Sequence, residues 1–152
     1  MEPSSFHDAE MLDRARGSVP DGYVPSEDEE YMNPRQQDYF RMLLIEWKRS
    51  IQNAALQTRA SLQHGPIREP DLNDRASSEA DWSIELRTRD RQRKLIAKID
   101  AALRLLDEGD YGYCEVTGEP IGLKRLIARP VATMTVEAQE AHERREKVSR
   151  DD

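Results

Sequence analysis

Apolar residues in one uninterrupted stretch of this sequence recur with the spacing of a coiled-coil seam. Residues 35–64 contain no glycine or proline, and Asn33-Pro34 before them suits a helix start, because Asn is a good N-cap and Pro fits the first helical position. The seam positions follow at spacings of 4, 3, 4, 3 and 4, namely Phe40, Leu44, Trp47, Ile51, Ala54 and Thr58. This pattern predicts a long helix that ends near His64 and pairs with another helix.

A second long helix is predicted after a loop. Residues 65–73 have the glycine, proline and asparagine content of a loop, Asp74 suits an N-cap, and the helix should run to about Glu108, before Gly109. Its distal half continues the seam with Leu95, Ile99, Ala102 and Leu106. Two helices of this length joined by a short loop pair antiparallel, and at ~1.5 Å per residue the hairpin would extend about 45 Å. We expect an apolar, packed base and a weakly held tip.

Composition supports an elongated helical protein. Apolar residues make up 37% of the chain and charged residues 35%, too few apolar side chains for a compact globule of 152 residues. We predict a mainly α fold with a long antiparallel coiled-coil hairpin, a small globular module and a C-terminal helix. The corresponding division is an acidic N-terminal segment (1–32), the hairpin (33–108, tip at 65–76), a turn-rich module (109–135) and a helix with its tail (136–152).

The acidic N-terminal segment carries the net charge of the chain. Residues 1–30 hold nine acidic residues against Arg14 and Arg16, a net charge of −7, which equals the charge of the whole chain. With its prolines and glycines, the segment is expected to be extended and solvated. The overall charge also argues against direct DNA binding.

Several function classes are excluded by what the sequence lacks. It has no glycine-rich phosphate loop, no G-x-S-x-G and no H-E-x-x-H, and its three histidines lie in separate segments, so an enzyme is not expected. The single Cys114 allows no internal disulfide, and there is neither a signal-peptide core nor an apolar run long enough for a membrane span. We therefore expect a cytoplasmic protein with no membrane association.

The second predicted helix contains a strongly basic stretch. Residues 87–94 include no apolar side chain, and six cations face only two acids, Glu85 and Asp90. The cations are Arg87, Arg89, Arg91, Arg93, Lys94 and Lys98. They fit a solvated surface that also pairs with acids of the partner helix, or a docking face for an acidic protein surface or an anionic ligand. Nucleic-acid binding is less favoured, because no aromatic residue is interleaved to stack on bases.

The module at 109–135 carries the frame of a four-cysteine zinc site with one cysteine left. C-x2-C, a 17-residue gap and a second C-x2-C would place ligands at Cys114, Thr117, Thr135 and Ala138. Zinc needs about four sulfur or nitrogen ligands, which this set cannot supply, so no metal is expected. Apolar contacts from Val116, Ile121, Leu126 and Val131 should substitute. Cys114 itself fits either a small buried hydrophobic residue or a redox-sensitive thiol.

Five motifs resemble the DksA/TraR family in their order and spacing, over about residues 28–148. They are Glu30-Tyr-Met-Asn33, Asp71-Leu-Asn-Asp74-Arg-Ala76, Glu85-Leu-Arg-Thr-Arg-Asp-Arg-Gln-Arg-Lys-Leu95, Tyr111-Gly-Tyr-Cys114 and Arg125-Leu-Ile-Ala-Arg-Pro130. The resemblance implies a bacterial regulator, expected to be a monomer, that enters the secondary channel of RNA polymerase, beside the β' subunit, tip first. Such factors bind no promoter DNA and shorten the lifetime of open complexes.

The resemblance also implies residue roles. The polymerase-effector tip corresponds to Asp71, Asp74 and Ala76, and the interface with the co-regulator guanosine tetraphosphate to Leu95, Lys98 and Arg129. Lys98 and Arg129 can offer charge-assisted hydrogen bonds to pyrophosphate. Gln139 stands where a nucleotide-contacting lysine is common, which predicts weaker synergy with the nucleotide. The cysteine set matches the cysteine-poor members of the family.

Two other functions remain open from the sequence. Paired acids at a hairpin tip would also suit a Gre-like transcript-cleavage stimulator, which recruits a second Mg²⁺ to the polymerase. Alternatively, the chain is a coiled-coil adaptor in which Asp71 and Asp74 are only helix caps.

Overall fold

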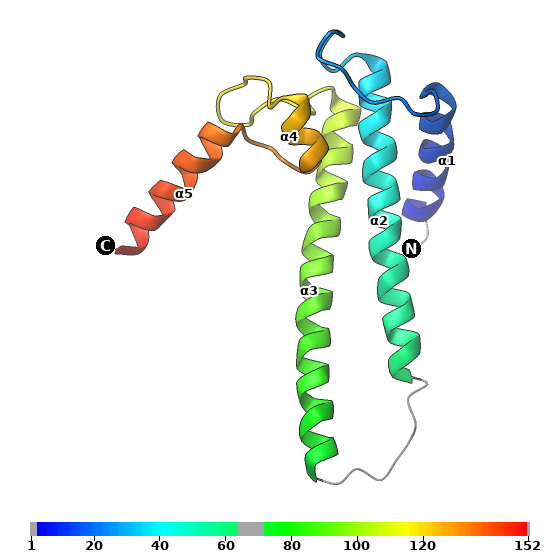
Figure 1. Ribbon diagram of the computed structural model, residues 1–152, viewed down its shortest axis with the longest axis vertical. Coiled ribbons are helices and arrows are strands. Elements are labelled where there is room, and N and C mark those ends of the chain that lie inside the picture. The colour runs from blue at the N-terminus through cyan, green and yellow to red at the C-terminus, as the bar shows by residue number, and fades with distance from the viewer. Residues whose placement is uncertain (1–2, 64–71, 152) are drawn as a thin grey trace. The chain divides into compact units, whose positions relative to one another are not determined.

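The computed structural model describes residues 3–63 and 72–151, with side chains over residues 7–60 and 78–150 (Figure 1). Within these ranges the chain forms helices α1 (Pro3–Ser18), α2 (Pro34–Gln63), α3 (Leu72–Glu108), α4 (Leu123–Ala128) and α5 (Val136–Asp151), and no strand. The predicted mainly α fold is confirmed. The chain divides into a first unit, Met1–Ile45 with Ile99–Asp152, and a second unit, Glu46–Lys98. The predicted division into four segments stays a prediction.

The start of α2 follows the capping chemistry that the sequence predicts. Pro34 is the first helical residue, and the Asn33 Oδ1 atom accepts a hydrogen bond from the Gln36 N–H at 2.8 Å. Gln36 is buried and accepts in turn from the Met32 N–H at 2.8 Å. His64, the predicted helix end, lies outside the described residues.

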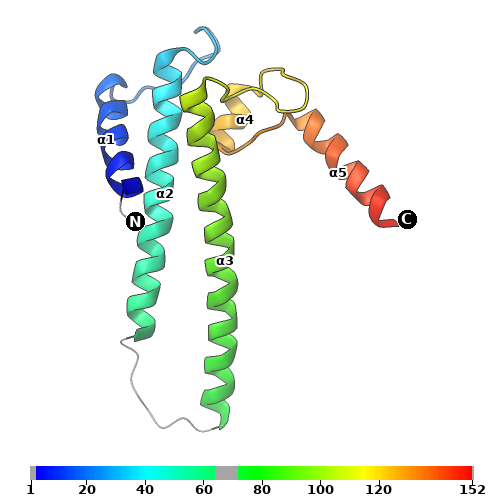
Figure 2. The same ribbon diagram turned by 180° about the vertical axis from the view of Figure 1, so that it is seen from behind.

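The first unit contains the packed base expected of the hairpin. In this unit α2 and α3 run antiparallel side by side (Figures 1 and 2), and Phe40, Leu44 and Ile99 are completely buried. Burial of such a side chain stabilises a fold by about 1.5–3 kcal/mol. Arg41 adds a polar link, with its guanidinium 3.2 Å from the Asp107 carboxylate on the opposite helix.

The turn-rich residues 109–135, called the turn module below, follow directly from the end of α3. Gly109 adopts φ +82°, a conformation typical of the glycine after a helix, and the Asp110 N–H donates to the Leu105 carbonyl at 2.9 Å. Of the four residues expected to replace a metal by apolar contacts, Ile121, Leu126 and Val131 are buried. Val116 is 59% exposed, so that part of the expectation was wrong: its side chain faces solvent from the turn after Cys114.

The sequence predicts that residues 1–32 are extended, but the structure has a helix in this segment. This helix is α1, whose Leu12 and Ala15 are buried, as is Val19 just after it. Leu12 and Ala15 lie three positions apart, so they share one face of α1. The expectation was wrong because this apolar face is narrow and is surrounded by charged residues. The Ser18 hydroxyl also donates to the Asp38 carboxylate of α2 at 2.6 Å.

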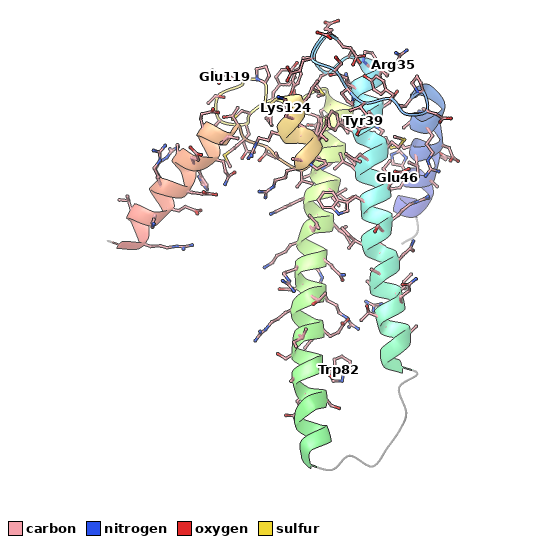
Figure 3. All side chains as sticks on the ribbon, viewed as in Figure 1. Arg35, Tyr39, Glu46, Trp82, Glu119 and Lys124 are labelled. Atoms are coloured by element: carbon pink, nitrogen blue, oxygen red, sulfur yellow. The ribbon has the colours of Figure 1, made fainter. Side chains whose placement is uncertain are left out.

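Most of the apolar side chains that the structure describes in the second unit are exposed. The predicted seam is not buried along its whole length, since Ala54 and Thr58 are exposed, in agreement with a weakly held distal part. On α3, Trp82 (labelled in Figure 3), Ile84 and Leu86 are each more than half exposed. None of the described helices is long and apolar enough to cross a membrane.

The first residue of α3 corrects one prediction. The helix begins at Leu72, so Asp74 is its third residue and not its N-cap. Asp71, three positions earlier in the sequence, is equally suited to the N-cap by residue type, and the choice between the two could not be made from composition.

Candidate interaction surface and turn module

Four exposed basic residues share one side of α3 in the second unit. They follow one another at spacings of 4, 3 and 4, which places them on a single helical face. These residues, the cationic face, are Arg87, Arg91, Lys94 and Lys98. At ~1.5 Å per residue they extend over about 16 Å of helix. The face therefore presents four cations to solvent, with Asp90 beside it.

The ion pairs of the basic stretch lie within α3 itself. Arg89 Nε is 3.0 Å from Glu85 Oε1, and Lys94 Nζ is 3.8 Å from Asp90 Oδ2, both at a spacing of four residues. Each of these two cations thus has an acid one turn away on its own helix, and pairing of the basic stretch with acids of the partner helix stays a prediction. Pairs of this kind contribute only about 0.3–0.5 kcal/mol.

A shallow hollow of about 440 Å³ opens beside the cationic face. It is lined by Ile84, Arg87, Asp90 and Arg91. Neither arginine makes an ion pair with another residue in the described part of the chain, and both side chains are exposed. Two fork-shaped donors next to an exposed aliphatic side chain suit an acidic protein surface that also carries apolar groups.

The predicted effector tip lies mostly outside the described residues. Asp71 is not described, and for Asp74 and Ala76 only the backbone is, in the first turns of α3. A carboxylate in the first turn of a helix is stabilised by the unpaired N–H groups and the helix dipole there. The chemistry expected of the tip stays a prediction.

The residues predicted to contact guanosine tetraphosphate divide between the two units. Leu95 is half-buried and Lys98 exposed on α3, three positions apart in the second unit. Arg129 is exposed at the end of α4 in the first unit, where its N–H donates to the Arg125 carbonyl at 2.7 Å. The Gln139 side-chain amide donates to Glu143 on α5 at 3.1 Å. A common binding site for these residues stays a prediction.

The four positions of the zinc-like frame are connected by hydrogen bonds. The Cys114 carbonyl accepts from the Gly118 N–H at 2.8 Å, and the Thr135 hydroxyl accepts from the Ala138 N–H at 3.2 Å, which caps α5. Cys114, Thr135 and Ala138 are buried, whereas Thr117 is exposed. These hydrogen bonds order the turn after Cys114 and the start of α5.

Two protein-family models together match most of the chain. Residues 36–106 match the model of the "DnaK suppressor protein DksA, N-terminal domain", and residues 109–144 match the "Prokaryotic dksA/traR C4-type zinc finger". The chain is 62% identical over 130 residues to the RNA polymerase-binding transcription factor DksA of Caulobacter vibrioides, which covers 86% of this chain and 92% of that protein. The chain belongs to the DksA/TraR family.

Two other members of the DksA/TraR family are similar to the chain over most of its length. The factor of the same name from Escherichia coli K12 is 41% identical over 125 residues, which are 82% of this chain and 83% of the Escherichia coli protein. The solved structure of transcription factor DksA2 from Pseudomonas aeruginosa superimposes with a TM-score of 0.70 at 39% identity, over 90% of this chain and 98% of that one.

The zinc expected of a C4-type finger does not fit this DksA/TraR module. Cys114 is its single thiol, and the other three frame positions offer two hydroxyls and a methyl group. Hydroxyl oxygens are poor zinc ligands and a methyl group is none. In the described part of the chain, no three His, Cys, Asp or Glu side chains come together as a metal site would require.

The Cys114 thiol lies among hydrogen-bond donors. Burial raises its pKa, but hydrogen bonds from the Thr117 hydroxyl and from the N–H groups of Thr135, Thr117 and Val116 outweigh burial and lower the pKa to about 6. The donors that would orient a metal-bound thiolate therefore favour the free thiolate instead.

We expect the Cys114 thiolate to appear near pH 6 when its ultraviolet absorbance is followed during a pH titration, against about 8.5 for an ordinary thiol. Because the pKa is lower in the folded chain, the resulting stabilisation is complete above the unfolded pKa and is lost as the pH falls through about 6. The difference in melting temperature between wild type and Cys114→Ala should widen from pH 6 to 9. A titration midpoint above pH 8 would contradict this assignment.

Two residues were missed by the sequence analysis. Ile84 was not expected at a binding hollow, because a single exposed aliphatic residue carries no signal in a sequence. Tyr31 belongs to one of the motifs that carry the resemblance but was given no role. In the structure its hydroxyl contacts Gly112 and Gly122 of the turn module.

Proposed function

We propose that this chain binds RNA polymerase and regulates transcription. Its relatives from Caulobacter vibrioides and Escherichia coli are named for that role, and they align with it over most of their length. The observation that carries the proposal is the exposed cationic face with its hollow, whose Arg87 and Arg91 form no ion pair with another described residue and suit an acidic protein surface. We assign polymerase docking to this face.

The proposed mode of action is entry into the secondary channel of the polymerase, beside the β' subunit, with the tip leading. Asp71, Asp74 and Ala76 then act near the catalytic centre, while the cationic face provides affinity. The protein acts as a cytoplasmic monomer, performs no catalysis and binds no zinc. It does not contact promoter DNA directly, because its net charge is −7 and acidic residues interrupt its basic stretch.

Guanosine tetraphosphate is the proposed co-regulator, at an interface formed by Leu95, Lys98 and Arg129. The two cations would contact pyrophosphate oxygens. Gln139 adds no positive charge, and its amide already donates to Glu143. Cooperation with the nucleotide should therefore be present but weak.

The test is the lifetime of open complexes at a ribosomal RNA promoter, measured with and without the protein and with and without guanosine tetraphosphate. A shortened lifetime, shortened further by the nucleotide, supports both parts of the proposal. A shortened lifetime that ignores the nucleotide supports the polymerase role and contradicts the nucleotide site. An unchanged lifetime overturns the regulatory role and leaves the Gre-like and adaptor alternatives.

A second assay separates the Gre-like alternative. On stalled elongation complexes, a cleavage stimulator releases short 3′ RNA fragments, whereas the proposed regulator leaves the transcript intact. Release of such fragments at the rate of a Gre control would replace the proposal.

A further inference from the structure

We propose that two glutamine side chains hold Met32 in a left-handed backbone conformation and thereby seat the turn module on the base of the hairpin. These side chains, the glutamine clip, belong to Gln36 and Gln37 at the start of α2. The clip, the packed base and the turn module all lie in the first unit. The inference concerns the assembly of that unit and does not depend on the polymerase role.

Met32 has an unfavourable backbone conformation. Its φ is +54°, and in the described part of the chain it is the one residue other than glycine with a positive φ. This region is disfavoured for such a residue, because its Cβ atom crowds the following carbonyl oxygen, so surrounding contacts must keep the residue there. Met32 is buried, which makes this conformation part of the packed first unit.

Both polar backbone groups of Met32 are engaged by the clip. The Gln36 Oε1 atom accepts from the Met32 N–H at 2.8 Å, and the Gln37 Nε2 atom donates to the Met32 carbonyl at 2.8 Å. Gln36 is fully buried, and its Nε2 atom lies 3.4 Å from both the Ser26 carbonyl and a Glu29 carboxylate oxygen. These two acceptors require the NH2 end of the amide, so the Oε1 atom faces Met32. The loop before α2 therefore sets the orientation of the clip.

The left-handed conformation places Met32 against the turn module. A Cβ atom at Gly112 would lie 3.0 Å from Met32 Cγ and 3.2 Å from Met32 Cε, so the methionine side chain packs directly on the backbone of that glycine. The preceding residue, Tyr31, donates from its hydroxyl to the Gly112 carbonyl at 2.6 Å. Two successive residues thus contact the same glycine, and the chain direction at Met32 determines whether they reach it together. Loss of the clip should release Met32 and loosen the module.

The first experiment tests whether position 32 is held left-handed, by comparing the melting temperatures of full-length Met32→Gly and Met32→Ala. Both variants lose the contacts of the methionine side chain, but only glycine adopts φ +54° without strain. Met32→Gly should therefore melt about 2–5 °C above Met32→Ala. At an unstrained position glycine is the less stable of the two, because its unfolded chain is more flexible. An equal or higher melting temperature of Met32→Ala would overturn the proposal.

The second experiment tests whether the clip causes this conformation. In a background with Gln36→Met and Gln37→Met, residue 32 should leave the left-handed region, so the advantage of glycine over alanine should disappear or reverse. If that background does not fold, Gln37→Met alone is used, because its amide is only half-buried, and it should reduce the advantage. An unchanged advantage in the background used would show that other contacts hold Met32, which contradicts the proposal.

Amide hydrogen exchange then tests the seating of the turn module. The Gly122 N–H, which donates to the Tyr31 hydroxyl at 3.1 Å, reports on this contact. In the clip variants it should exchange about threefold faster or more, whereas amides of the packed base should change less. Gln52→Met, exposed on the same helix, is the matched control and should keep wild-type rates. Equal acceleration in the module and the base would mean that the clip only stabilises the fold in general, and the seating role would be wrong.

Discussion

Asp74→Asn should abolish the effect of the protein on open-complex lifetime while changing its affinity for RNA polymerase by no more than about twofold. The substitution keeps the size and shape of the side chain and removes only its charge. Asp74 is the third residue of α3, where loss of the charge–dipole interaction costs about 0.3–1 kcal/mol, too little to unfold a helix of 37 residues. The measurements are promoter-complex decay and direct binding to the polymerase.

Asp81→Asn is the matched control for this prediction. Asp81 lies on the same helix seven positions later, is exposed, and undergoes the same chemical change. It should behave as wild type in both assays. If binding and activity fall together in Asp74→Asn, the tip is a docking element and not an effector. If neither changes, the aspartate serves only the helix start, as the adaptor alternative requires.

The double substitution Arg87→Glu with Arg91→Glu should weaken binding to RNA polymerase by roughly ten- to a hundredfold, about 1.4–2.8 kcal/mol. Both guanidinium groups line the hollow beside the cationic face, and neither is engaged in an ion pair within the described chain. Reversing their charge replaces attraction to an acidic surface by repulsion. Competition binding at several salt concentrations measures the loss, which should diminish as salt increases.

Arg93→Glu controls for the change in net charge. Arg93 is exposed on the same helix, but its position relative to Arg87 and Arg91 places it on the far side from the cationic face. At saturating protein the arginine variants should recover wild-type activity, because their tip is intact, whereas Asp74→Asn should not. If Arg93→Glu lost at least half as much binding free energy as the double variant, the cationic face would act only through nonspecific charge.

Local chemistry predicted the start of α2 and the end of α3 well. Asn33, before Pro34, accepts a hydrogen bond from a backbone N–H at the start of α2. Gly109, after Glu108, adopts the positive φ at which α3 ends. Few other residue types can do either, so these boundaries follow from residue type. The packed base follows from the spacing of Phe40, Leu44 and Ile99. These signals are local, and tertiary contacts reinforce them.

Features that depend on weak or competing signals were predicted less well. The helix around Leu12 and Ala15 has a narrow apolar face in an acidic segment, so charge outweighed periodicity in the prediction. Asp71 and Asp74 compete for the same cap, and the sequence offers no means to rank them. The contact of Tyr31 with Gly112 joins residues distant in sequence, which no local pattern encodes.

The division of the chain into two units also separates its natural chromophores. Both tryptophans, Trp47 and Trp82, belong to the second unit, and all five tyrosines belong to the first: Tyr23, Tyr31, Tyr39, Tyr111 and Tyr113. Tryptophan emission therefore follows the second unit alone, while the tyrosine bands of near-ultraviolet dichroism follow the first. Without any label, one heated sample reports on each unit by its own signal, and transitions that do not coincide would mean that the chain melts in two steps.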